Sequence, residues 1–335
     1  MSKKEEMSLL ASIDMGTNTF RLLVAEVENG VSFKEIYSEN RTTRLGEGLA
    51  QNKRLIPAAV NRAISALSHF RSILKRYPVD DVVVIATSAV RKARNKEVFL
   101  KEVKERTGLD VEVISGETEA LCTYRGVNII FENEAGPMLV VDVGGGSTEF
   151  IGSEGGTPNF CLSSALGVVH LAERFLQSDP PASEELRALR GAIEAVIEPV
   201  AHRFPQRCRF VGTGGTATTL AAIDQGMTDY DPEKINRYPL SLATIKSIFE
   251  RLSSMTLSER KVVPGLEEGR EDILIPGALI LLTVMEYFGY DPLYVSDYGL
   301  REGILIDRFL DAQSARPSRS SRSEESVKGG PSCRQ

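Results

Sequence analysis

The stretch Val141-Asp142-Val143-Gly144-Gly145-Gly146-Ser147-Thr148 decides the fold, because it repeats the pattern of Ile13-Asp14-Met15-Gly16-Thr17-Asn18. In each copy an apolar strand ends in an aspartate, which is followed by glycine and then by hydroxyl or amide side chains. The two aspartates, at positions 14 and 142, lie 128 residues apart. This distance is too long for the unit of a solenoid and fits a duplicated domain. A carboxylate followed by glycines with accessible backbone N–H groups is typical of a site that holds a metal ion beside a phosphate.

Length, composition and charge narrow the class of protein. The 335 residues suffice for two domains, and 42% apolar with 26% charged residues is ordinary for a globular protein. The net charge of −6 argues against a generic nucleic-acid binder. No secretory signal pattern opens the chain, and the longest nearly apolar run, 273–284, is too short to span a bilayer. We therefore expect a cytoplasmic protein with neither a nucleic acid nor a membrane as partner.

Strand and helix patterns alternate twice along the chain. Strands are expected at 9–14, 20–28, 31–39, 82–86, 111–114, 139–142, 148–152, 159–162, 210–212 and 293–296, and Asn29-Gly30 predicts a hairpin turn. Helices are expected at 57–76, 96–107, 117–127, 168–176, 183–203, 216–223, 242–253, 272–288 and 300–310. The order predicts an α/β fold of two domains, 1–127 and 128–311, which face each other across a cleft lined by glycine turns.

Two segments could contact a partner: the C-terminal tail and one apolar helix. Residues 312–335 contain five cations and two anions among Ser, Gly and Pro, with Val327 as the only aliphatic side chain, so we expect a disordered basic tail. A solvated tail is favoured over one that contacts a polyanion. The apolar helix at 272–288 could be core or interface; we favour core, and a homodimer stays open.

The glycine run before Ser147 is the strongest local signal for a ligand. Consecutive glycines let several N–H groups point one way and form an anion-binding nest, to which the Ser147 hydroxyl can add. Asp142 precedes the loop and Glu149 follows it, which suits a divalent cation held against phosphate oxygens. No Gly-Lys-Ser/Thr follows, so the loop is not a Walker loop. A strand rather than a helix comes next, so it is not a Rossmann fingerprint either.

Two more segments could contact an anion. The second glycine loop, Gly214-Gly215, opens a helix, and helix N-termini favour anions. Arg91 follows the expected strand at 82–86, where a guanidinium could grip a phosphate in a fork. A solvated helix start is the favoured interpretation of the neighbouring cations Lys92, Arg94 and Lys96.

A pair of glutamates begins the helix expected at 117–127. Glu117 is explained by the helix dipole alone, whereas Glu119 could either complement the dipole or activate a water as general base. Spacing in the sequence does not choose between these two roles of Glu119.

In this order the segments resemble the exopolyphosphatase / guanosine pentaphosphate phosphohydrolase (Ppx/GppA) family, in its short two-domain form. The resemblance runs from Ile13 to about Ile304 and is carried by DMGTNTFRL at 14–22, ATSAVR at 86–91, ISGETEA at 114–120, DVGGGSTE at 142–149 and SDYGLREG at 296–303. It implies the actin-like ATPase fold, with duplicated ribonuclease-H-like domains around a central cleft. It also implies magnesium-dependent removal of a terminal phosphoryl group.

The resemblance also implies roles for individual residues. Glu119 matches the family's catalytic base, and Asp142 and Glu149 match its metal-associated carboxylates. Arg91 matches a phosphate-contacting position, and we assign it to catalysis with Glu119. We expect phosphate contacts from Asp14, Gly16, Asn18, Gly144, Gly145, Gly146, Ser147, Gly214 and Gly215.

The resulting prediction is a phosphohydrolase that uses Mg²⁺ (or Mn²⁺) to release terminal orthophosphate from inorganic polyphosphate, guanosine pentaphosphate or both. Such chemistry depends on charge neutralisation and alignment. The alternatives are a phosphotransferase or ATPase of the same superfamily, which needs a nucleoside pocket, and a non-catalytic polyphosphate or alarmone sensor. The sequence does not rank the two substrates.

Overall fold

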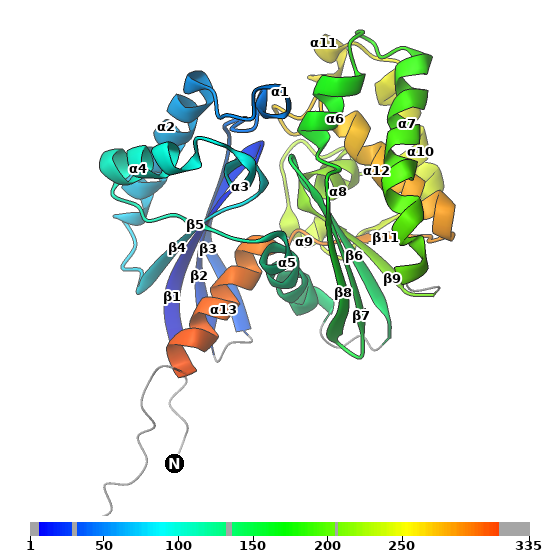
Figure 1. Ribbon diagram of the computed structural model, residues 1–335. Coiled ribbons are helices and arrows are strands. Elements are labelled where there is room, and N and C mark those ends of the chain that lie inside the picture. Colours follow the sequence, from blue (N-terminus) through cyan, green and yellow to red (C-terminus); the bar gives the residue numbers. More distant parts are fainter. Residues whose placement is uncertain (1–6, 29–31, 132–135, 205–206, 315–335) are drawn as a thin grey trace, which may run out of the picture.

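Two mixed sheets lie side by side with helices around them (Figure 1). The computed structural model describes residues 7–28, 32–131, 136–204 and 207–314. The turn expected at 29–30 lies outside these ranges, as do residues 315–335 of the tail expected at 312–335. Residues 312–314 of that expected tail instead continue the last helix, which ends at Ser314. Within them, no helix has the length and apolar character needed to cross a membrane.

The first sheet has the strand order β3-β2-β1-β4-β5. It consists of β1 (Met7–Met15), β2 (Thr19–Glu28), β3 (Ser32–Thr42), β4 (Asp81–Ala86) and β5 (Glu112–Val113). The first three strands form an antiparallel meander, and β4 and β5 continue in parallel from β1.

The second sheet repeats this plan in the order β10-β11-β9-β6-β7-β8. Its strands are β6 (Met138–Val143), β7 (Thr148–Glu154), β8 (Thr157–Ser164), β9 (Arg209–Thr213), β10 (Pro239–Leu240) and β11 (Leu293–Val295). β6 to β8 form the meander, and β9 and β11 run parallel to β6 and to each other. Asp14 on β1 and Asp142 on β6 therefore occupy equivalent positions, which confirms the predicted duplication.

Helices from the first half cover one face of the first sheet (Figure 1). They are α1 (Leu49–Asn52), α2 (Pro57–Leu74), α3 (Ser88–Lys92) and α4 (Lys96–Thr107). Apolar residues at helical spacing bury the inner face of α2, and Pro57 at its first turn suits helix initiation. α4 ends at Gly108, which has a φ of 74°. The five residues of α3 are too few to show a periodic pattern.

A larger helical layer covers one face of the second sheet. It contains α6 (Val168–Phe175), α7 (Ser183–Ile197), η1 (Glu198–Arg203), α8 (Gly214–Asp224), α9 (Pro232–Ile235), α10 (Leu242–Ser253), α11 (Leu257–Arg260) and α12 (Leu274–Phe288). The helix predicted at 183–203 changes to a 3₁₀ turn after Ile197, because Pro199 has no backbone N–H to donate. All residues of α12 from Leu274 to Met285 are buried, so its expected role as core is confirmed.

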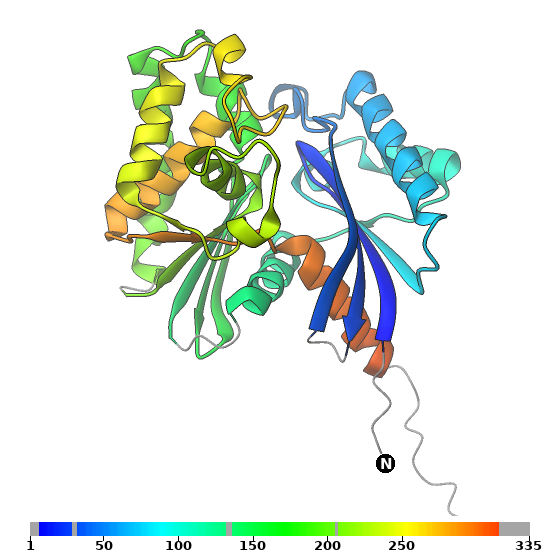
Figure 2. The same ribbon diagram turned by 180° about the vertical axis from the view of Figure 1, so that it is seen from behind.

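Two helices lie between the sheets: α5 (Gly116–Phe131) and α13 (Leu300–Ser314) (Figures 1 and 2). α5 packs against the second sheet through Ala120, Tyr124, Val127 and Phe131. α13 packs against the first sheet through Leu300, Ile304, Leu305 and Phe309. Each helix thus covers the sheet of the other half of the chain. Domains defined by packing would therefore differ from domains defined by chain order. The boundary at 127/128 stays a prediction.

Glycines let these two helices approach closely. A Cβ atom on Gly303 would lie 1.7 Å from the carbonyl oxygen of Cys122, and one on Gly126 would lie 1.9 Å from that of Gly299. Because only glycine fits at such distances, the sequence fixes how α5 crosses α13. This crossing determines where Glu119, in the first turn of α5, is held.

Candidate functional site

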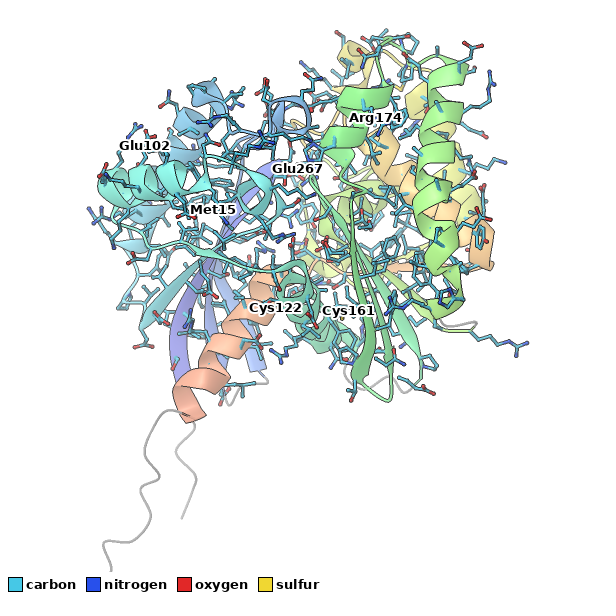
Figure 3. The ribbon with its side chains drawn as sticks, viewed as in Figure 1. Met15, Glu102, Cys122, Cys161, Arg174 and Glu267 are labelled. Carbon is cyan, nitrogen blue, oxygen red and sulfur yellow. The ribbon has the colours of Figure 1, made fainter. Side chains whose placement is uncertain are left out.

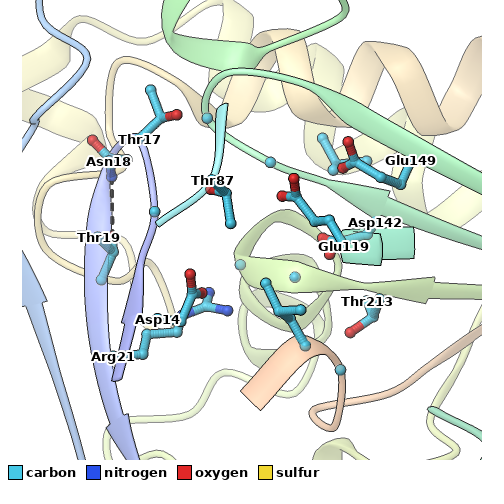
Figure 4. Close-up of a pocket in the computed structure, with 18 of the residues that line it drawn as sticks. Asp14, Thr17, Asn18, Thr19, Arg21, Thr87, Glu119, Asp142, Glu149 and Thr213 are labelled. Atoms are coloured by element: carbon cyan, nitrogen blue, oxygen red, sulfur yellow. Dashed lines mark hydrogen bonds between the residues drawn. The ribbon is translucent and has the colours of Figure 1, made fainter. Parts of the chain in front are cut away.

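The glycine turns and strand ends of both halves enclose one polar cavity between the sheets (Figure 4). Of the residues expected at the site, those that line it are Asp14, Gly16, Asn18, Glu119, Asp142, Gly144, Gly145, Gly146, Ser147, Glu149, Gly214 and Gly215. They lie in the stretch from residue 14 to residue 215, and the duplicated fold brings them together. Arg91 is not among the lining residues.

The loop at 144–147 is held by its carbonyl groups. The Gly144 and Gly145 oxygens accept the N–H groups of Val168 and Val169, at 3.1 and 3.0 Å. The Gly146 oxygen accepts from Ser88 Oγ at 3.0 Å and Lys92 Nζ at 2.8 Å. A trans peptide N–H points opposite to its carbonyl, so the amides that follow these carbonyls turn toward the cavity. This is the geometry of an anion nest.

The loop at 214–215 presents the N-terminus of α8 to the same cavity. Gly214 has a φ of 79°, and a Cβ atom there would lie 2.4 Å from Asp142 Oδ1. At Gly215 a Cβ atom would lie 2.0 Å from Cζ of Arg270, whose guanidinium packs over the loop. A helix N-terminus with an arginine beside it favours an anion.

Carboxylates surround the cavity at high local density. Burial raises the pKa of Asp14 to about 6; the charge of Arg21 opposes this rise, and the weaker repulsion from Asp142 adds to it. Burial and the charge of Asp142 raise the pKa of Glu149 to about 7, although Ser163 Oγ donates to Glu149 at 2.7 Å. Burial also raises the pKa of Asp142. Such a cluster is electrostatically costly unless a cation neutralises it.

Glu119 projects from α5 into the cavity beside Glu149 and Asp142 (Figure 4). Burial raises its pKa well above the usual range, and the charge of Glu149 adds to this. Nη1 of Arg91 donates to Glu119 Oε2 at 3.0 Å and to the Ile114 carbonyl at 2.8 Å. The contact of Arg91 is therefore with the carboxylate, and its expected grip on phosphate stays a prediction.

Several cations at the cavity were not singled out from the sequence. Arg21, Arg270 and Arg301 line it, and Arg301 is buried with Nη2 3.1 Å from Glu302 Oε1. The pairing of Asp14 with Arg21 across β1 and β2 could have indicated Arg21, because adjacent strands place such residues opposite each other. Arg270 lies in a charged loop that has no periodic signal. Lys92 is exposed, as its solvated interpretation expects, and its Nζ also donates to the Gly146 carbonyl.

No ready-made metal cage is present in the part of the chain that the structure describes: no three His, Cys, Asp or Glu side chains converge on one point. The polar atoms Asp14 Oδ1, Thr17 Oγ1 and Asn18 Oδ1 are nevertheless buried at the cavity without a hydrogen-bond partner. An oxygen-only donor set with few protein ligands fits Mg²⁺, which keeps water and phosphate oxygens in its coordination shell.

Two ribonuclease-H-like halves that meet at a polar cleft define the actin-like ATPase fold, as expected from the sequence. Within that class, the chain belongs to the Ppx/GppA phosphatase family, whose profile matches residues 23–312.

Relatives and solved structures agree with this assignment. Exopolyphosphatase 2 of Mycobacterium tuberculosis is 33% identical, over 90% of this chain and 98% of its own length. The crystal structure of the Aquifex aeolicus member of the Ppx/GppA family has a TM-score of 0.77 and 33% identity, and covers 92% of this chain and 99% of its own. A guanosine-5′-triphosphate,3′-diphosphate pyrophosphatase of Pseudoalteromonas atlantica is 30% identical over 91% of this chain, which spans 59% of that longer protein.

Proposed function

We propose that the protein is a Mg²⁺-dependent phosphohydrolase that releases terminal orthophosphate from inorganic polyphosphate, guanosine pentaphosphate or both. The observation that carries this proposal is the single cavity in which two amide-rich loops face Glu119, Asp14, Asp142 and Glu149. Such an arrangement suits phosphoryl transfer, in which alignment and charge neutralisation supply most of the rate enhancement.

Asp142 and Glu149 would hold the magnesium ion, with Asp14 facing them from the other half of the fold. Bound there, Mg²⁺ would neutralise charge on the phosphate and on the carboxylates. The unpartnered oxygens of Thr17 and Asn18 suit the cation or its waters. The amides after Gly144 and the N-terminus of α8 would bind the phosphate oxygens.

Glu119 would orient and deprotonate the attacking water. The two carboxylate oxygens of Glu119 are not equivalent, because the hydrogen bond from Arg91 goes to Oε2. Arg91 is itself fixed by the Ile114 carbonyl, so the pair holds the carboxylate in one orientation. A base whose pKa is raised by burial accepts a proton more readily, provided that it is ionised before each turnover.

Orthophosphate release from polyphosphate and from guanosine pentaphosphate, each with and without Mg²⁺, tests the proposal. We expect free orthophosphate from at least one substrate, only with the cation. A product in which phosphate has moved to an acceptor would instead support a phosphotransferase. Tight binding without any release would support a sensor.

A second cavity lies beside the candidate site, and its lining suits a nucleotide substrate. It has a volume of about 280 Å³ and shares Arg21, Gly214, Asp297 and Arg301 with the candidate site. Apolar side chains such as Met227 and Leu266 line its other wall. A mixed cavity next to phosphate ligands suits a nucleoside, whether of guanosine pentaphosphate or of ATP.

A further inference from the structure

A separate cavity of about 780 Å³ opens between the two halves near α1 and α6. It has no lining residue in common with the candidate site. Lys53 and Lys92 line it from the first half, and His170 and Arg174 line it from α6 in the second half. Neither the family assignment nor the proposed catalytic chemistry gives this cavity a role.

The charges that face this cavity are mostly positive. Lys53, Lys92 and Arg174 supply three cations, whereas Glu173 is the acidic residue that lines it. Glu173 is partly engaged elsewhere, since its Oε1 accepts the Gly48 N–H at 2.9 Å. A cavity with an excess of cations favours a polyanion.

His170 adds a polar group that has no protein partner. Its Nδ1 is buried, and no hydrogen bond to it is formed within the described ranges. Burial lowers the pKa of His170 to about 4, and Lys92 and Lys53 add to this effect. The ring is therefore neutral at physiological pH, and it can donate one N–H to an anion.

Local contacts restrain the backbone at Lys53 and the side chain of Arg174. Lys53 has a φ of 54°, which is unusual for a residue with a side chain, and its carbonyl accepts the Arg94 N–H at 2.9 Å. The guanidinium of Arg174 stacks over the Phe175 ring, 5.0 Å from its centroid. Figure 3 places Arg174 on α6, beside the cleft between the halves. The stacked guanidinium of Arg174 loses less entropy when it binds an anion, and at Lys53 it is the backbone that is restrained.

Lys92 connects this cavity with the candidate site. Its Nζ bonds the Gly146 carbonyl, and Gly146 lines the site on the other side. The first turn of α6 bonds the same loop through the Val169 N–H. If a linear polyphosphate places its end group at this loop, its next phosphates lie close by. Those phosphates need positive charges near them.

We infer that this cavity binds the non-reacting phosphates of an extended inorganic polyphosphate chain. The inference rests on the proposed function and deepens it, because it favours a linear chain over a nucleotide with few phosphates. Lys53 and Arg174 would then determine how strongly affinity grows with chain length.

The test measures dissociation constants for long-chain polyphosphate and for tripolyphosphate, with Mg²⁺ present. The protein carries Glu119→Gln so that the ligands are not consumed, and it is compared with and without Lys53→Gln plus Arg174→Gln. We expect the ratio of long-chain to tripolyphosphate affinity to fall roughly tenfold, the effect of two solvent-accessible charge contacts. The matched control is Lys246→Gln, an exposed lysine on α10, which should leave the ratio unchanged.

The inference is overturned if the ratio changes less than twofold, if both ligands weaken equally, or if the parent protein binds no polyphosphate. The measurement is independent of turnover. A wild-type protein that releases no orthophosphate would end the proposed hydrolysis, while the affinity ratio would still decide the role of the cavity. The dependence of long-chain affinity on salt should also become shallower in the double variant, because fewer cations are neutralised by the chain.

Discussion

At the scale of single residues, Glu119 is the proposed catalytic base. It is buried in the cavity, its carboxylate is oriented by Arg91, and its helix is fixed by the crossing with α13. Two residues away, Glu117 is exposed on the same turn of the helix. The two glutamates thus have the same chemistry and different surroundings.

Replacing Glu119 by Gln should lower the rate of orthophosphate release by about 10²–10⁴, the usual cost of losing a general base. Glu117→Gln should keep the wild-type rate, because its carboxylate does not face the cavity. Steady-state phosphate release by both variants checks this. An enzyme with Glu119→Gln that kept full turnover would remove the base from the mechanism.

At the scale of elements, two helices position the site, and each of them packs on the sheet of the other half of the chain. α5 belongs in sequence to the first half and packs on the second sheet, while α13 does the reverse. The position of Glu119 on α5 therefore depends on how α5 crosses α13, and so on the packing of both halves.

Gly303→Ala should destabilise the protein, because the added methyl group would lie 1.7 Å from the Cys122 carbonyl oxygen and force the helices apart. We expect a loss of about 1–3 kcal/mol in the free energy of unfolding, as for overpacked cores, together with slower turnover. In contrast, Gly191→Ala on α7 meets nothing within 4 Å and should be neutral or stabilising. Denaturant unfolding of both variants is the measurement, and equal stabilities would contradict the crossing.

The contact of α13 with the first sheet can be tested in the same way. Leu305 is fully buried there, so Leu305→Ala should cost about 2–5 kcal/mol in the free energy of unfolding. Leu310, on the same helix, is 46% exposed, and Leu310→Ala should stay within about 0.5 kcal/mol of the wild type. If the two variants unfolded alike, α13 would not be part of the core.

Most helices and strands could be predicted from the sequence, because their signals are local. Examples are the apolar periodicity in α2 and the continuous apolar runs in β4 and β6. The duplication and the glycine loop at 144–147 followed from the repeat, and the loop at 214–215 from a glycine pair at a helix start. The exchange of α5 and α13 could not be predicted, since each helix has an apolar face that fits either sheet. Arg270 could not be predicted either, because its place over Gly215 arises only from tertiary packing.

At the scale of the whole molecule, the cleft concentrates buried carboxylates that have raised pKa values, namely about 6 for Asp14 and about 7 for Glu149. In the unfolded chain both pKa values are close to 4. Protonation is thus favoured in the folded state, and these groups contribute stability that is full below about pH 4 and is lost as the pH rises through 6 to 7.

Magnesium should restore this lost stability by binding the ionised carboxylates of the folded protein alone. We expect Mg²⁺ to raise the melting temperature more at pH 8 than at pH 5, where protonation of the carboxylates competes with the metal. Thermal unfolding with and without Mg²⁺ at both pH values is the measurement, with Asp142→Asn as the variant that should lose most of the shift. Equal shifts at both pH values, or none, would count against a metal at this cluster.

The proposed hydrolysis requires that one cavity holds the terminal phosphate between the loops at 144–147 and 214–215, within reach of residue 119. A crystal structure of the Glu119→Gln variant with tripolyphosphate and Mg²⁺ tests it most directly. We expect a terminal phosphate bonded to amides of both loops, with the residue 119 side chain beside it. Phosphate bound elsewhere, with this cavity left to water, would contradict it.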